Sequence, residues 1–140
     1  MNKSEKNIED KFYIDIVSRI LEILSGRGRL EVFLTISEEK GIAIDEIANK
    51  VDVPRSSIYK FIRDFSDESM IKNQGGNYYL TELGIKISEK IRELSNEIIP
   101  LKYEIDIQRI RDESKTRFGS PIGDEVEKFL REKVKELKNK

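Results

Sequence analysis

The spacing of hydrophobic positions predicts that the chain begins with two helices. From Ile8 to Leu24 apolar residues recur every three or four positions, on a stripe wider than one helical face. We therefore expect this helix to be covered by more than one neighbour. Gly26 and Gly28 suit its end and the turn after it. A second helix is predicted from about Arg29 to Lys40, with Gly41 as its stop.

A short strand and two more helices are predicted next. The segment 42–44 is too short for a free strand but can pair at the edge of a small sheet. Asp45 is a good N-cap for the following helix. Pro54 suits the first position of another helix. The apolar residues of that helix follow the i, i+3, i+4, i+7 pattern of one buried face: Ile58, Phe61, Ile62 and Phe65.

The second half of the chain combines a hairpin with long helices. Segments 70–74 and 77–80 flank two glycines, which indicates a tight β-hairpin. A long helix is predicted from Thr81 until Pro100 ends or kinks it. Its apolar residues form a seam for another helix: Leu83, Ile87, Ile91, Leu94 and Ile98.

Two helices are predicted after Pro100, over 101–117 and 121–138. A break at Gly119 and Ser120 separates them, because glycine can stop one helix and serine can cap the next. The apolar side of the last helix again requires a partner surface: Ile122, Val126, Phe129, Leu130, Val134 and Leu137.

Composition narrows the class of protein. Of the 140 residues, 37% are hydrophobic and 38% charged, with 26 Lys and Arg against 27 Asp and Glu, as in a soluble globular protein with an ionic surface. The chain has a polar beginning and no apolar run of membrane-spanning length, so we expect a cytoplasmic protein without a membrane partner. The abundance of Ile, Lys and Glu, with only two glutamines, resembles hyperthermophile proteins.

Enzymatic chemistry is disfavoured by the residue types present. The chain contains no cysteine and no histidine, which removes disulfides, thiolate metal sites and the commonest general base. The acids, lysines and tyrosines show no spacing that pairs a nucleophile with a base or gathers metal ligands. We expect no catalytic residues, no metal and no cofactor.

The order of elements over residues 29–97 resembles the winged helix-turn-helix family of transcription regulators. Residues 45–62 are similar to the helix-turn-helix of MarR-like and IclR-like regulators, with small Ala48 allowing the two helices to approach closely. Asp52 stands at a turn position that is often glycine in this family, and Asp is among the few residues that visit the left-handed region. The resemblance implies a mainly α fold with a small β-hairpin wing, and binding to double-stranded DNA. An IclR-like effector domain would not fit in the remaining residues.

Within this resemblance, the second helix of the motif supplies the candidate DNA-binding residues. With its apolar residues inward, Ser56, Lys60 and Arg63 lie near the centre of the opposite face. Three residues flank that face: Arg55, Ser57 and Tyr59. The beginning of such a helix enters the major groove, where hydroxyl, Lys and Arg donors meet bases or phosphates.

Further contacts are predicted around the recognition helix. Lys72 on the hairpin and Asn77 at its tip are candidates for the adjacent DNA backbone or minor groove. Arg27 and Arg29 are candidates for phosphate contacts. The backbone N–H groups after Pro54 are placed to hold a phosphate. For each of these residues the alternative is a solvated surface side chain.

The charge balance keeps a second function open. Residues 26–99 contain 11 Lys and Arg and 13 Asp and Glu, a net charge of −2, whereas DNA-binding domains usually show a basic excess. Asp64, Asp67 and Glu68, at the end of the recognition helix, argue against DNA. The alternative is a winged-helix protein-interaction module of transcription or chromosome machinery.

The helices outside the module predict assembly. We expect residues 1–25 and 98–140 to mediate homodimerisation and residues 26–97 to bind DNA, because the flanking apolar stripes exceed what the module can cover. A two-fold dimer would meet half-sites about 34 Å apart, or a multiple of that spacing, on an imperfect palindrome. The alternative is that these helices fold back on their own module.

Overall fold

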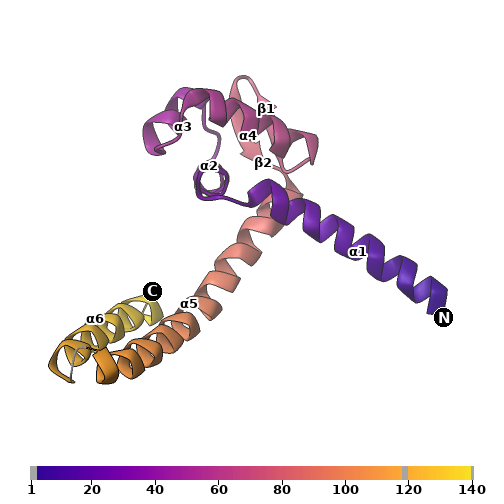
Figure 1. Ribbon diagram of the computed structural model, residues 1–140. Helices are drawn as coiled ribbons and strands as arrows, with labels where there is room; N and C mark the ends of the chain where they lie inside the picture. The colour runs from indigo at the N-terminus through magenta and orange to yellow at the C-terminus, as the bar shows by residue number, and fades with distance from the viewer. Residues whose placement is uncertain (1–2, 118–119, 140) are drawn as a thin grey trace. The chain divides into compact units, whose positions relative to one another are not determined.

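A computed structural model of the protein describes residues 3–117 and 120–139. The chain divides into two compact units, residues 1–88 and 89–140, and α5 contributes to both. The elements, labelled in Figure 1, are in order α1 (Lys3–Leu24), α2 (Arg27–Ser37), α3 (Ile44–Lys50), α4 (Arg55–Asp67), β1 (Ile71–Gln74), β2 (Asn77–Leu80), α5 (Glu82–Arg117) and α6 (Ser120–Lys138). Among the described residues, no helix is both long enough and apolar enough to cross a membrane.

The core of the first unit lies where α2, α3, α4 and the hairpin meet. Phe33 on α2 and Phe65 on α4 are fully buried, and their rings meet edge to face with centroids 5.6 Å apart. The other buried apolar residues of this core come from the same elements and from the turns between them: Val32, Ile36, Ile42, Ile47, Val51, Ile58, Ile62, Met70 and Ile71. Since each large apolar side chain contributes about 1.5–3 kcal/mol when buried, this cluster holds the unit together.

The hairpin has the predicted place and register. Strands β1 and β2 are antiparallel, with Gln74 opposite Asn77. Gly75 and Gly76 both have positive φ, 64° and 87°, which the two central residues of a tight hairpin turn require. Ile42 bridges to Tyr78, with backbone N–O distances of 3.1 and 2.8 Å, so the predicted pairing at the sheet edge is confirmed for Ile42. Ala43 and Ile44 instead form the N-cap and the first residue of α3.

Three predictions about helix ends in the module are wrong by small shifts. Helix α2 begins at Arg27 and ends at Ser37, so Gly28 lies inside it. Ala43, not Asp45, is the N-cap of α3, and Asp45 sits in the first turn, where a carboxylate favours the positive end of the helix. Pro54 is the N-cap of α4, one position before the predicted one.

The conformation expected of Asp52 is also wrong. Among the described residues, the only non-glycine residue with positive φ is Ser69, at 60°. Val51, the C-cap that follows α3, is extended, with φ −117° and ψ 151°. The chain therefore leaves the helix without a left-handed residue, and the turn does not need glycine.

Pro100 does not end its helix. Helix α5 continues through it from Glu82 to Arg117, so the two helices predicted on either side of Pro100 are one. A proline removes a single backbone donor, while the turns before and after it keep their own hydrogen bonds. Of the predicted break, Ser120 begins α6, and Gly119 lies outside the described residues.

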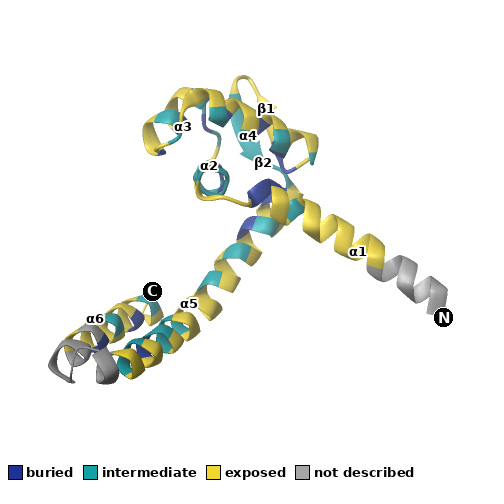
Figure 2. Ribbon diagram, viewed as in Figure 1, coloured by how far each residue is buried: buried dark blue, intermediate teal, exposed yellow. Residues whose placement is uncertain are grey.

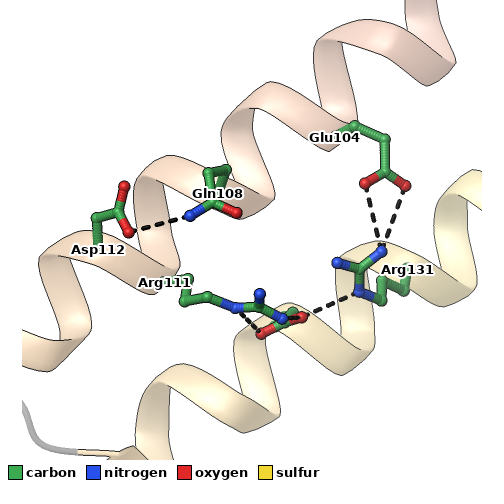
Figure 3. A network of polar contacts seen from close by, with 6 residues as sticks. Glu104, Gln108, Arg111, Asp112 and Arg131 are labelled. Atoms are coloured by element: carbon green, nitrogen blue, oxygen red, sulfur yellow. Dashed lines mark hydrogen bonds and ion pairs between the residues drawn. The ribbon is translucent and has the colours of Figure 1, made fainter.

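The second unit is a helical pair made of α6 and the later part of α5. Ile107 on α5 and Val134 on α6 are buried. Beside them Glu127 of α6 accepts hydrogen bonds from Arg111 of α5, with one N–O distance of 2.8 Å, and from Arg131 at 3.0 Å. Arg131 also reaches Glu104 of α5 at 3.3 Å, so the ion pairs connect the two helices (Figure 3). The side chains of Ile122 and Val126 lie outside the described residues.

Helix α1 is less covered than its sequence predicts. Among the residues of α1 whose burial the structure describes, from Lys11 on, only Ile23 and Leu24 in the last turn are buried, and residues 11–19 are exposed (Figure 2). The exposed apolar residues of α1 are Phe12, Tyr13, Ile14, Ile16, Val17 and Leu21. Within one chain, the prediction that several neighbours cover this helix is therefore wrong for residues 11–19, which are all exposed.

Two glycine substitutions should affect stability differently. A Cβ at Gly84 would clash with the carbonyl oxygen of Met70, whereas a Cβ at Gly28 would meet Val53 at 3.4 Å, an ordinary contact. We expect Gly84→Ala to lower the free energy of unfolding by about 1–3 kcal/mol. Gly28→Ala should leave it unchanged or raise it by up to about 1 kcal/mol, because alanine favours the helix. Urea unfolding followed by circular dichroism measures both; equal stability of the two variants would contradict this packing.

The Glu127 cluster should make the second unit sensitive to acid. Hydrogen bonds from Arg111 and Arg131 hold the pKa of Glu127 below its ordinary value. Its contribution is therefore present above the glutamate pKa of the unfolded chain and is lost as pH falls through the lowered folded value. We expect Glu127→Gln to lower the melting temperature near pH 7. We also expect the melting temperature of this variant to fall less than that of the parent between about pH 5 and pH 3.

The matched control for this prediction is Glu132→Gln, which changes an exposed carboxylate on the same helix. It should melt like the parent chain across the whole pH range. Thermal melts followed by circular dichroism compare the three proteins, and identical pH profiles for both variants would contradict a role of the Glu127 cluster.

Candidate nucleic-acid interface

Helix α4 has one buried face and one exposed face. Ile58, Ile62 and Phe65 are buried and Phe61 is half-buried. On the opposite side Ser56, Lys60 and Arg63 are all exposed. Tyr59 beside them is 53% exposed, and Ser57 is half-buried. The inward and outward residues of α4 therefore lie where the helical spacing predicts.

The first turn of α4 offers backbone donors next to this face. The Pro54 carbonyl accepts hydrogen bonds from the amides of Ser57 and Ile58, both at 3.0 Å. The amides of Arg55 and Ser56 precede the first helical hydrogen bond and so point out of the helix end. Such N–H groups, at the positive end of a 13-residue helix, are suited to a phosphate.

Arg55 connects the two helices of the motif. Its guanidinium donates to the Asp45 carboxylate in the first turn of α3. This hydrogen bond raises the pKa of Arg55 above its ordinary value. Both side chains are largely exposed, so the pair is a weak link in energy. It connects the first turn of α4 with the first turn of α3.

Arg29 is engaged inside the module. Its guanidinium bonds the Asp64 carboxylate at 2.8 Å and lies over the Phe61 ring, 4.6 Å from the centroid. Only 20% of its side chain is exposed. Arg29 therefore helps to fix the position of α4 through its contacts with Asp64 and Phe61.

The acids at the end of α4 are largely paired. Asp64 bonds Arg29, and Glu68 accepts a hydrogen bond from Arg19 of α1 at 3.0 Å, which raises the pKa of Arg19. In the described part of the chain, neither Lys60 nor Arg63 forms an ion pair. Positive and negative charges are therefore separated along α4. The cations without an ion pair lie on its outer face, and two of the three acids are paired with arginines of α1 and α2.

The remaining predicted residues lie on other elements. Lys72 is exposed on β1, opposite Tyr79, and Asn77 is half-buried where β2 leaves the turn. Arg27 is exposed at the start of α2. Gln74, exposed beside Asn77, is a further polar residue of the wing tip, and it was not among the predicted contacts. Its position next to the two turn glycines is the sequence feature that identifies it as a tip residue.

Comparison with known families decides the class of this module. A family model described as winged helix-turn-helix matches residues 26–98, more than half of the chain. The chain belongs to the winged helix-turn-helix family. The predicted fold class, mainly α with a hairpin wing and additional helices, is thereby confirmed. No curated protein and no solved structure matches the chain.

Membership of the winged helix-turn-helix family assigns roles to the elements. Helices α3 and α4 are the helix-turn-helix, with α4 as the second helix, and β1 and β2 are the wing. The winged helix-turn-helix is typically a DNA-binding fold. In the described residues, no group of three or more acidic side chains is arranged to hold a metal ion.

The internal role of Arg29 can be measured by a double-mutant cycle. Arg29→Ala and Asp64→Ala should each lower the free energy of unfolding of the module. The double variant should lose less stability than the two single variants lose together. We expect a coupling of about 0.5–1 kcal/mol, because both side chains are partly exposed. Urea unfolding gives the four stabilities. Strictly additive losses would show that the two residues do not interact.

Proposed function

We propose that this winged helix-turn-helix protein is a sequence-specific regulator of transcription that inserts α4 into the major groove of double-stranded DNA. The observation that carries the proposal is the exposed face of Ser56, Lys60 and Arg63 on the second helix of the motif. Lys and Arg donors suit guanine or phosphate, and serine hydroxyls suit bases or phosphates.

Each neighbouring element adds contacts to this mechanism. The first-turn amides of α4 hold a phosphate and set the depth of the helix in the groove. Arg55, Ser57 and Tyr59 flank the base contacts. Lys72 and Asn77 on the wing follow the adjacent backbone or minor groove, and Arg27 meets a phosphate. Arg29 acts by fixing α4 rather than by touching DNA.

The charge distribution supports DNA binding despite the acidic total. The module carries a net charge of −2 over residues 26–99. Pairing of Asp64 and Glu68 with arginines from other helices reduces the negative field at the end of α4. The unpaired cations of the outer face then meet the phosphates.

We infer that the regulator works as a homodimer. Among the described residues, both α1 and α5 carry large exposed apolar side chains. A two-fold dimer places two α4 helices on half-sites about 34 Å apart, or a multiple of that spacing, so the operator is an imperfect palindrome. The function resembles that of MarR-like regulators, with repression by occlusion of the promoter, and the DNA partner places the protein in the cytoplasm.

A second candidate function is a protein-interaction module of transcription or chromosome machinery. The observation in its favour is the net negative charge of the module. It would use the winged helix-turn-helix without a groove-facing basic helix. The two functions differ in whether the outer face of α4 meets phosphates.

Substitution of the basic face tests the proposal. Lys60→Ala combined with Arg63→Ala should weaken binding to DNA selected from a random pool by about tenfold or more. If both residues contact phosphate, the slope of log K against log salt should fall by about 2. Mobility shifts over a salt series measure both quantities.

The matched control removes the same charge elsewhere. Lys128→Ala combined with Lys135→Ala changes two exposed lysines of α6. It should bind like the parent chain. Equal affinity of the Lys60 and Arg63 double variant and the parent would refute DNA insertion of α4 and favour the protein-interaction module.

A further inference from the structure

One ion pair joins the two helices of the helix-turn-helix near the start of each. Nη1 of Arg55, the first residue of α4, donates to Oδ1 of Asp45, the second residue of α3. Among the described residues, no other ion pair connects these two helices. The pair therefore lies at the beginning of α4, the part of the second helix that enters the groove in such motifs.

Stability does not account for this pair. The Arg55 side chain is 55% exposed and the Asp45 side chain 79%, so water screens their attraction and the pair is weak. The two helices are already held by the apolar core, to which α3 contributes the buried Ile47 and α4 the buried Ile58. The main effect of the pair is therefore on the direction of the Arg55 side chain.

The pair leaves most of the Arg55 donors free. A guanidinium carries five N–H donors in one plane. In the part of the chain that the structure describes, Asp45 is the only hydrogen-bond acceptor of Arg55, and it bonds a single nitrogen, Nη1. Because the guanidinium is rigid, a carboxylate that bonds one nitrogen also restricts where the others, Nε and Nη2, can point. A second acceptor would then bind a side chain whose freedom is already reduced.

The position of Asp45 is unfavourable for DNA binding unless its carboxylate is neutralised. The proposed function, on which this inference rests, brings the beginning of α4 into the major groove, and Arg55 and Asp45 then come close to the phosphates. An unpaired carboxylate at that place repels DNA. The bond to Arg55 offsets this repulsion, so the carboxylate can hold the arginine at little cost in affinity.

The geometry points to Asp45 as a positioning residue that holds Arg55 for a guanine of the operator. Arginine donates two parallel hydrogen bonds to O6 and N7 of guanine in the major groove. Adenine carries an amino donor where guanine carries O6, so it accepts only one of the two bonds. Arg55 thus reads one base pair at the edge of the exposed face of α4. Asp45 acts through Arg55 and touches no base.

This role predicts different changes in specificity and in general affinity. Asp45→Ala frees the Arg55 side chain, which then loses more conformational freedom on binding guanine. The preference for guanine over adenine at one base pair should therefore fall by about three- to tenfold. Binding to DNA that lacks the operator should be unchanged or stronger, because one negative charge beside the phosphates is gone. A residue needed only for the fold of α3 would instead weaken binding to both kinds of DNA alike.

A double-mutant cycle on base preference tests the role in the full chain. The parent selects DNA sites from a random pool, and each G·C pair of the selected site is then replaced by A·T. Mobility shifts measure each preference with the parent, Asp45→Ala, Arg55→Ala and the double variant. Arg55→Ala should reduce one preference by about tenfold or more, since it removes the bidentate contact. Asp45→Ala should reduce the same preference, and adding it to Arg55→Ala should change that preference no further.

The matched control is Glu46→Ala, which removes an exposed acid from the same turn of α3. It should keep the base preferences of the parent. Thermal melts followed by circular dichroism should agree within about 5 °C for all variants, because the pair of Arg55 and Asp45 is exposed.

The outcomes separate this inference from the proposed function. If the parent selects no DNA sequence, the proposed function is refuted, and the role of Asp45 with it. If the parent binds selectively, three results would overturn the role of Asp45 alone. These are an unchanged preference in Asp45→Ala, an equal loss in Glu46→Ala, and a further loss when Asp45→Ala is added to Arg55→Ala.

Discussion

The contact between the apolar side of α4 and the core of its unit determines what the protein presents to a partner. Phe65 meets Phe33 edge to face, and Ile58 and Ile62 are buried beside them. Residues of a helix are fixed relative to one another, so burying this side sets the rotation of the whole helix. Each of these side chains contributes about 1.5–3 kcal/mol, against about 0–1 kcal/mol for an exposed ion pair. Apolar packing therefore aims Ser56, Lys60 and Arg63 outward, and the ion pairs adjust the charge around them.

Two helices that precede the helix-turn-helix change the charge around α4. Arg29 of α2 and Arg19 of α1 bind Asp64 and Glu68 at the end of α4. Arg29 also stacks on Phe61, so it stabilises the rear of α4 while neutralising an acid. Helix α1 lies before the segment that matches the family, yet it modifies the field of the recognition helix. A net charge of −2 is therefore compatible with a basic outer face, because the acids and the cations are not evenly mixed.

Helix α5 packs on α6 and also carries exposed apolar side chains. Toward α6 it combines the buried Ile107 with an ion-pair cluster centred on Glu127, which is specific in geometry because several hydrogen bonds must form together. The contact with α6 holds the second unit together, and the exposed apolar side chains support the proposed dimer. Exposed apolar residues on α1 add surface that a dimer can cover.

The sequence by itself determined the local structure, because helical periodicity, turn glycines and prolines act over a few residues. It identified the hairpin at Gly75 and Gly76, the pairing of Ile42 at the sheet edge, and the inward and outward residues of α4. It predicted the wrong N-cap for α3, the wrong conformation for Asp52 and a helix end at Pro100 that does not exist. In each case neighbouring turns and packing outweigh a single residue's preference. Only the tertiary structure decided which charges are free. Arg29 reads as a surface cation in the sequence, and its pairing with Asp64, 35 residues away, depends on how α2 and α4 pack.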